Sequence, residues 1–238
     1  MKIKWGHIKL VLIIGLMAFL YGFSAHRNAH RTIKTPIIEF LGDKNLFITQ
    51  EDVSKLLIQS QGPVENKPKD IIDLNELENA LNANDLIKRA EAFLEVDGEL
   101  TVQIQQKQPL ARVVNGDFYV DTDGLYMPLS TNYSARVPLV TGTVSKDNLN
   151  NVYKLAKIVN KDEFLKKHVI EIRQNQDSTM VIRLRGYDFD VFLGNLHRIE
   201  KKINNLRAFY KKALKDNTLN NYRVVNLKFD NQVVCTKK

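Results

Sequence analysis

The spacing of apolar residues divides the chain into one continuous apolar run and two regions of mixed periodicity. Residues 10–23 contain no charged side chain. Extending this run to residues 8–25 gives a segment just long enough for a thin bilayer, at about 1.5 Å per helical residue. Residues 36–113 and 114–238 each combine helical spacing with strand-like alternation. The pattern predicts an N-terminal apolar helix followed by two α+β units.

We interpret residues 1–25 as a cytoplasmic tail with a transmembrane anchor, and residues 26–35 as a juxtamembrane linker. Three basic residues lie on each side of the central apolar run, so the positive-inside rule leaves the orientation nearly undecided. A short tail before a large folded body favours a cytoplasmic N-terminus. A cleaved signal peptide is an alternative, because the apolar run is short and lysines precede it. A buried helix in a soluble fold is the other alternative.

Residues 36–113 predict the order strand, helix, helix, strand, strand. Thr49 with Asp52 three positions later indicates a capping box, and Asp73 repeats this signal before the second helix. Asp97-Gly98 is a strong hairpin signal. The strand that follows is predicted to direct three apolar side chains inward, Leu100, Val102 and Ile104.

Residues 114–238 predict an antiparallel sheet backed by helices. Asp123-Gly124 indicates a hairpin, residues 138–142 a loop, and Ser145 a helix cap. Further strands are predicted over residues 169–173, 180–184, 187–194 and, as one final strand, 222–234. A long helix over residues 196–214 has an apolar seam. Its other face is predicted to be basic, through Arg198, Lys201, Lys202, Arg207, Lys211, Lys212 and Lys215.

Charge is distributed unevenly along the 238 residues. The net charge of +8 consists of +6 over residues 1–35, −8 over residues 36–145 and +10 over residues 146–238. This alternation argues against one uniform basic surface that wraps a nucleic acid. A single cysteine, Cys235, excludes an intrachain disulfide and a cysteine-rich zinc site.

The sequence offers little that indicates catalysis. It has no P-loop, no G-x-S-x-G and no H-E-x-x-H motif. His26 and His30 are four residues apart, but two histidines without a third ligand are weak evidence for a metal site. Asp188 and Asp190 could form a glycosidase-like pair, but alternating polar positions on a solvent-facing strand explain them more simply. We therefore predict no enzyme activity, no cofactor and no metal.

The first unit resembles a POTRA domain, through the FITQEDV start of its first helix and the final hairpin that leads into QKQPLARV. One such domain after a single N-terminal span resembles the FtsQ (DivIB) family of bacterial cell-division proteins. The second unit extends the resemblance through its PLVTG segment, its FLG strand end, the lysine-rich helix and the closing YRVVNLKFDNQVV. The resemblance covers residues 8–234 and depends mainly on the order of these motifs.

The resemblance implies a non-enzymatic divisome scaffold at the septum, in the bacterial inner membrane. The implied partners are FtsB (DivIC)-like and FtsL-like proteins and other divisome components, with the bilayer contacted by residues 8–25 and no nucleic acid bound. An FtsB-like strand would add at the edge of the last strand. The residues implied in this contact are Lys228, Phe229, Val225, Leu227, Asn195 and Lys202. Asn195 occupies a position where the family often has an arginine.

Two alternatives to this function remain open. One is another POTRA-bearing envelope chaperone or scaffold for protein export or outer-membrane assembly. The other is an exported envelope enzyme with a cleaved signal peptide. The basic helix could likewise contact a partner, a lipid surface or only solvent, and the sequence does not choose among these.

Overall fold

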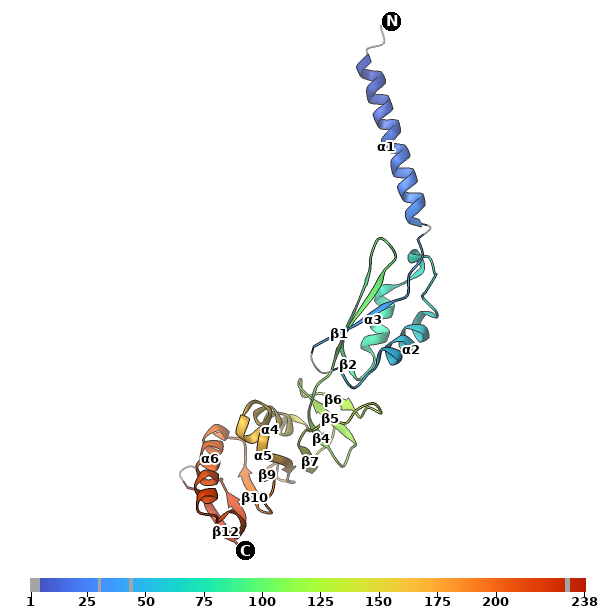
Figure 1. Ribbon diagram of the computed structural model, residues 1–238. Coiled ribbons are helices and arrows are strands. Elements are labelled where there is room, and N and C mark those ends of the chain that lie inside the picture. The colour runs from blue at the N-terminus through green and yellow to red at the C-terminus, as the bar shows by residue number, and fades with distance from the viewer. Residues whose placement is uncertain (1–4, 30, 43–44, 230–231) are drawn as a thin grey trace. The chain divides into compact units, whose positions relative to one another are not determined.

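The computed structural model describes residues 5–29, 31–42, 45–229 and 232–238. The chain divides into two compact units, Met1–Gln106 and Lys107–Lys238 (Figure 1). This division precedes the predicted boundary at residue 113, because residues 109–113 pair within the sheet of the second unit. Several residues used in the sequence predictions lie outside the described residues, namely residues 1–4 of the tail, His30, and residues 230 and 231 of the predicted final strand.

Helix α1 (Trp5–Ala29) contains the apolar run. Its segment Lys9–Asn28 has a mean hydropathy of 1.6 and is long and apolar enough to cross a membrane. None of that segment is buried against the rest of the described chain. Its length and composition therefore fit a membrane anchor.

The first unit has the predicted order of elements. They are β1 (Ile37–Leu41), α2 (Gln50–Gln61), η1 (Lys69–Ile71), α3 (Leu74–Asn82), β2 (Ile87–Leu94) and β3 (Leu100–Gln106). In the three-stranded sheet, β3 lies in the middle, antiparallel to β2 and parallel to β1. The predicted capping box is confirmed, because the Thr49 hydroxyl accepts from the Asp52 N–H and the Asp52 carboxylate accepts from the Thr49 N–H. Asp73 caps α3, as predicted.

The core of the first unit lies between this sheet and its two α-helices. The three side chains predicted to point inward from β3 are fully buried. They pack with α2 and α3 through Val53, Leu57, Leu77 and Leu81. At the end of β3, the buried Gln106 accepts hydrogen bonds from the N–H groups of Phe47 and Ile48 and donates one to the Ile48 carbonyl. Gln106 thereby fixes the loop that leads into α2.

In its described residues, the second unit contains one nine-stranded sheet and three α-helices. The strands are β4 (Pro109–Val113), β5 (Phe118–Asp121), β6 (Tyr126–Pro128), β7 (Leu139–Gly142), β8 (Val169–Gln174), β9 (Met180–Leu184), β10 (Asp190–Gly194), β11 (Tyr222–Asn226) and β12 (Val234–Lys237). The helices are α4 (Asn150–Lys161), α5 (Glu163–His168), α6 (Ile199–Lys215) and the short η2 (Leu219–Asn221). The α+β class and the helix-backed sheet are confirmed.

The sheet is mixed rather than purely antiparallel. Its spatial order is β12-β11-β10-β9-β8-β7-β4-β5-β6, and β4–β7, β7–β8 and β10–β11 are parallel neighbours. The prediction of a loop over residues 138–142 is wrong, because β7 pairs on both sides inside the sheet. Gly142 ends β7 with a φ of +89°, and a Cβ at this position would lie 2.1 Å from the Gln174 carbonyl oxygen. This close approach requires glycine.

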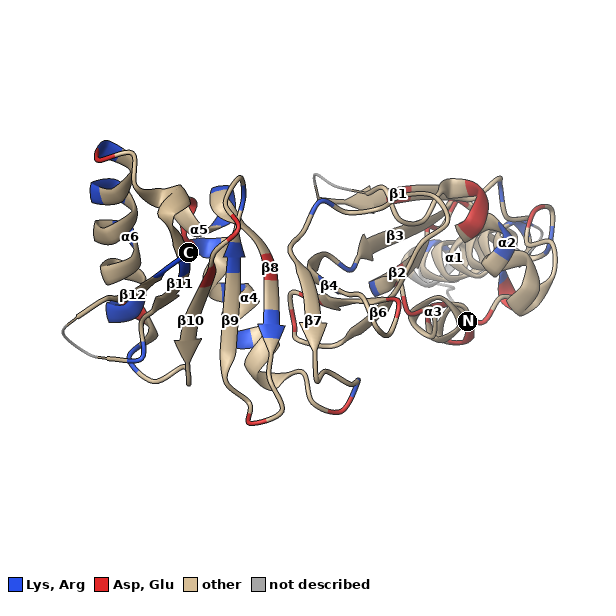
Figure 2. Cartoon of the chain, turned by 90° about the horizontal axis from the view of Figure 1, so that it is seen from below, with Lys and Arg blue, Asp and Glu red and all other residues tan. Residues whose placement is uncertain are grey.

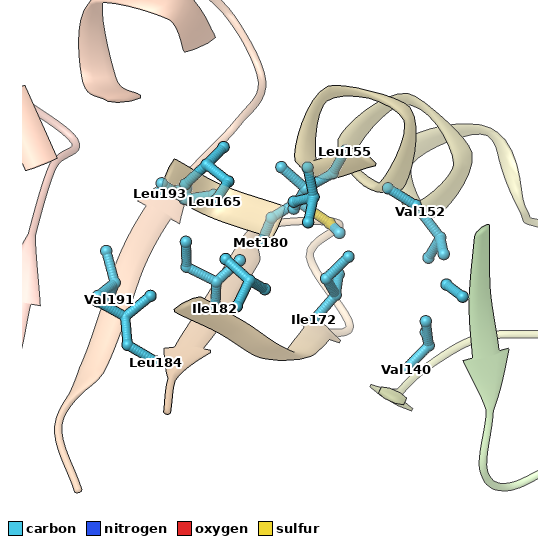
Figure 3. Close-up of a cluster of buried hydrophobic side chains, with 14 of the residues drawn as sticks. Val140, Val152, Leu155, Leu165, Ile172, Met180, Ile182, Leu184, Val191 and Leu193 are labelled. Atoms are coloured by element: carbon cyan, nitrogen blue, oxygen red, sulfur yellow. The ribbon is translucent and has the colours of Figure 1, made fainter. Parts of the chain in front are cut away.

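Helices α4, α5 and α6 pack on one face of the sheet and bury a single apolar core. Figure 3 shows Val152 and Leu155 of α4 and Leu165 of α5 above the strand side chains. The strand side chains in this cluster are Val140, Ile172, Met180, Ile182, Leu184, Val191 and Leu193. On α6, the predicted seam is buried at Ile203, Leu206 and Ala213. Burial of this many large apolar side chains is the main stabilising contribution of the unit.

Two helix predictions in this unit were incomplete. Ser145 does not cap α4, which begins at Asn150 after a turn in which the Ser145 carbonyl accepts from the Asn148 N–H. Helix α5 was not predicted. It begins where the Asp162 carboxylate accepts from the Leu165 N–H at 3.0 Å. Its six residues are too few to show a clear helical period.

The opposite face of the sheet carries ion pairs that cross several strands. Arg173 donates to both carboxylate oxygens of Asp190, and Arg183 donates to Glu171. Burial opposes ionisation of Glu171, but the Thr141 hydroxyl and the two arginines outweigh it and lower the pKa of this carboxyl. Asp188, the other residue of the candidate glycosidase pair, forms an ion pair with Lys238. Both aspartates therefore have a structural explanation.

Candidate partner-binding edge

Strand β12 forms one edge of the nine-stranded sheet. It pairs antiparallel with β11, with Val225 opposite Cys235 and Asn226 opposite Val234. Within the described part of the chain, β12 has no second strand neighbour. Its backbone N–H and C=O groups that point away from β11 are therefore not used in the sheet, and another strand could pair with them.

The side chains of β12 alternate between the core and the surface. Cys235 packs against the core of the second unit, and burial raises the pKa of its thiol. Val234 is 40% exposed, and Thr236 is exposed as well. The outer surface of β12 therefore offers backbone hydrogen bonds and one apolar side chain, that of Val234. The Cys235 thiol faces the core.

Strand β11 supports this edge from the inside. It is parallel to β10, and beyond its end the Leu227 N–H donates to the Phe192 carbonyl at 2.8 Å. Val225 is completely buried and Leu227 is 1% exposed. Both were predicted as partner contacts, but their side chains belong to the core. Their role is to hold β11 in place, because buried side chains do not reach a partner.

A connection separates β11 from β12, so the prediction of one strand over residues 222–234 is wrong. The chain turns where the Asn226 side-chain oxygen accepts from the Lys228 N–H at 2.9 Å. Lys228 and Phe229 follow, and the Phe229 side chain is 45% exposed. The structure thus places both predicted contact residues at the surface, in the connection between β11 and β12.

Lys202 differs most from its prediction. It was assigned to the outer face of the long helix, but it is 5% exposed and lies on the inner face. Its Nζ donates to the carbonyl oxygens of Leu193 and Asn195 at 2.8 and 2.7 Å, and to Asn195 Oδ1 at 3.2 Å. Lys202 therefore links α6 to the end of β10, and it orders the Asn195 turn from within.

The Asn195 turn lies close to Lys228. A Cβ on Gly194 would lie 3.7 Å from Lys228 Cγ and from the Phe192 ring. On the neighbouring β8–β9 turn, the Thr179 hydroxyl and backbone N–H lower the pKa of Asp177, and the Lys228 charge contributes to this shift. The cation of Lys228 is thus near a carboxylate of its own chain, and a partner carboxylate would compete with Asp177 for it.

The described residues contain no group of three or more His, Cys, Asp or Glu side chains that could hold a metal ion. This edge offers backbone hydrogen-bonding groups and exposed apolar surface. Sequence reasoning did not identify β12 as a separate strand. The signal available was the change from the apolar positions of β11 to the polar residues at 230–232.

Comparison with known families agrees with this architecture. A family model described as POTRA-like domain matches residues 42–105. A second, described as FtsQ/DivIB, C-terminal related, matches residues 108–236, which is more than half of the chain. The chain belongs to the FtsQ/DivIB family. A search of curated proteins found no match.

Membership in the FtsQ/DivIB family identifies the chain as a division-related scaffold with a POTRA-like domain. The family is one of non-catalytic scaffolds, and it implies interactions with other divisome proteins. Together with helix α1, it indicates a single-pass membrane protein. Each of the two matched ranges lies within one of the two units.

Proposed function

We propose that the chain recruits an FtsB (DivIC)-like protein, together with its FtsL-like companion, to the division septum. The partner would add one strand to β12. The observation that carries the proposal is the edge position of β12, with Val234 exposed on this strand and Phe229 exposed in the connection that precedes it. Backbone pairing supplies affinity in such complexes, and flanking side chains supply selectivity.

Amide hydrogen exchange tests strand addition directly. We expect the FtsB homologue of the same organism to slow exchange at amides within Val234–Lys237, because new ladder hydrogen bonds protect them. Strand β6 is the internal control, since it forms the other edge of the same sheet. Binding that leaves the β12 amides unprotected would refute strand addition.

Phe229→Ala tests the apolar anchor. We expect this change to weaken FtsB-like binding by about 1–2 kcal/mol, which is the typical loss for a contributing aromatic contact. Phe93→Ala is the matched control, because Phe93 is 48% exposed and lies in the first unit. Equal affinities of the two variants in a titration would contradict the role of Phe229.

Under this proposal α1 crosses the inner membrane with its N-terminus in the cytoplasm, and both folded units lie outside the cytoplasm. A reporter fused after Lys238 that is active only in the cytoplasm would contradict this topology. Fluorescent fusions should concentrate at midcell, and depletion should give filamentous, unseptated cells. A uniform envelope distribution with normal septa would instead favour an export or assembly scaffold.

A further inference from the structure

The positive charge of the second unit is concentrated in its helices. The unit has 23 Lys and Arg against 13 Asp and Glu, a net charge of +10. Helices α4, α5 and α6 alone have eleven Lys and Arg against two Glu, a net charge of +9. Figure 2 shows blue turns along α6, whereas red and blue segments lie side by side on β8 and β9. The strands and loops are therefore nearly neutral, and the helical layer carries the excess.

Ten of the eleven cations in this layer are exposed, Lys202 being the buried one. On α4 they form a stripe at helical spacing, Lys154, Lys157 and Lys161. On α6 a second stripe consists of Arg207, Lys211 and Lys215. Within each row, like charges three or four residues apart repel one another, and an acidic partner would offset that repulsion.

A groove lies between these stripes. A cavity of about 430 Å³ separates the C-terminal half of α4 from the first turns of α6. Ile158 and Ile203 contribute apolar surface to it, and Lys161, Asn204 and Arg207 line its sides. Asp162 and Glu200 also line it, so the groove combines apolar surface with charged groups of both signs, and the exposed cations of the α4 stripe continue beyond it.

The two acidic side chains that line the groove, Asp162 and Glu200, each interact with groups of their own chain. Asp162 caps α5 through one carboxylate oxygen and forms an ion pair with Arg207 through the other, at 2.6 Å. Glu200 lies in the first turn of α6, where the helix dipole stabilises a carboxylate. The two cations and two carboxylates of the lining therefore balance, and the excess positive charge beside the groove comes from the exposed Lys154 and Lys157 of α4.

We propose that this groove binds an acidic segment of a protein partner, which places one apolar side chain between Ile158 and Ile203 and its carboxylates against the α4 stripe. Charge complementarity and the apolar surface together favour a peptide. A lipid surface fits less well, because the described residues of the three helices expose one large apolar side chain, that of Leu214. This surface is distinct from the β12 edge and does not depend on it.

Peptide titrations with the full-length chain in neutral detergent test the proposal. The probe is a short glutamate-rich peptide with one central leucine, and its control has serine at that position. We expect the leucine peptide to bind about tenfold more tightly, because it buries one leucine side chain. Its affinity should fall with added salt. Equal binding of the two peptides would overturn the apolar site. Titration of each peptide into micelles without protein corrects for partitioning of the peptide into detergent.

Two kinds of variant test the basic stripe and the apolar surface of the groove separately. The triple variant Lys154→Glu, Lys157→Glu, Lys161→Glu should lower the affinity of the leucine peptide by about tenfold or more. The charge-matched control replaces three exposed arginines elsewhere in the unit, Arg136, Arg185 and Arg223, by glutamate. Equal loss in both triple variants would show diffuse attraction and overturn the site.

Asn204→Trp should fill the groove without changing charge, and it should remove the advantage of the leucine peptide. Asn220→Trp, at an exposed position that does not line the groove, is its control. Both variants should still bind the FtsB-like protein, so failure of this proposal is distinguishable from failure of strand addition. Binding to anionic vesicles that exceeds peptide binding, or self-association lost in the α4 triple variant, would identify a different occupant and overturn the proposal.

Discussion

Replacing the buried Lys202 by methionine should selectively destabilise the second unit. Methionine fills a similar volume but donates no hydrogen bond, so the Leu193 and Asn195 carbonyl oxygens lose a donor at 2.8 and 2.7 Å. Each hydrogen bond from a charged donor contributes about 1.5–3 kcal/mol. The buried ammonium no longer has to be desolvated, which offsets part of the loss. We expect a net cost of about 2–3 kcal/mol.

Urea denaturation followed by tyrosine circular dichroism measures this effect in the intact chain. Seven of the eight tyrosines lie in the second unit, the other is Tyr21 in α1, and the POTRA-like domain has none. With a urea slope of about 1–3 kcal/mol per molar, the midpoint should fall by roughly 1 M or more. Lys201→Met, at the adjacent exposed position, should change the free energy of unfolding by less than about 0.5 kcal/mol. Equal midpoints for the two variants would refute the stabilising role of the Lys202 hydrogen bonds.

Two further substitutions test the sheet. Gly142→Ala should cost several kcal/mol or prevent folding of the second unit, because its Cβ would lie 2.1 Å from a carbonyl oxygen. Gly186→Ala, also at positive φ but in open space, should cost only about 1 kcal/mol in the same urea assay. The folded-state pKa of Glu171 lies below its ordinary value of 4.5, so its ionisation stabilises the fold above that pH and the contribution is lost as pH falls through the folded value. Glu171→Gln should therefore reduce the stability of the second unit at neutral pH and flatten its decline in acid, and an unchanged acid profile would contradict this.

The first unit could be predicted in detail because its signals are local. Thr49, Asp73 and the Asp97-Gly98 hairpin each specify structure within a few residues of themselves. Strand β7 could not be recognised in this way. Its four residues form parallel pairs with strands distant in sequence, and no turn signal accompanies such pairing. The general fold class followed from periodicity, but the position of β7 required tertiary contacts.

The residues predicted for the partner contact include several whose side chains lie in the core. Lys202 was assigned to solvent by its charge, although it follows Ile199 by three residues and precedes Leu206 by four, and so lies on the apolar side of α6. Val225 and Leu227 have apolar side chains that suit either a core or an interface, and sequence alone does not distinguish these. Phe229 reads as the continuation of a strand until the Asn226 turn is known.

The order of strands in the sheet has a consequence for how the second unit is made. From β7 to β12, spatial order follows chain order, so each new strand docks beside the one synthesised just before it. If the unit is exported vectorially, as the proposed topology requires, the growing edge would move outward with every strand that emerges, and each partly translocated chain would expose a different edge. The β12 edge exists once Val234–Lys237 have docked. Recruitment through this edge would thus be coupled to completed translocation, and a stalled chain would present no native β12 edge for binding.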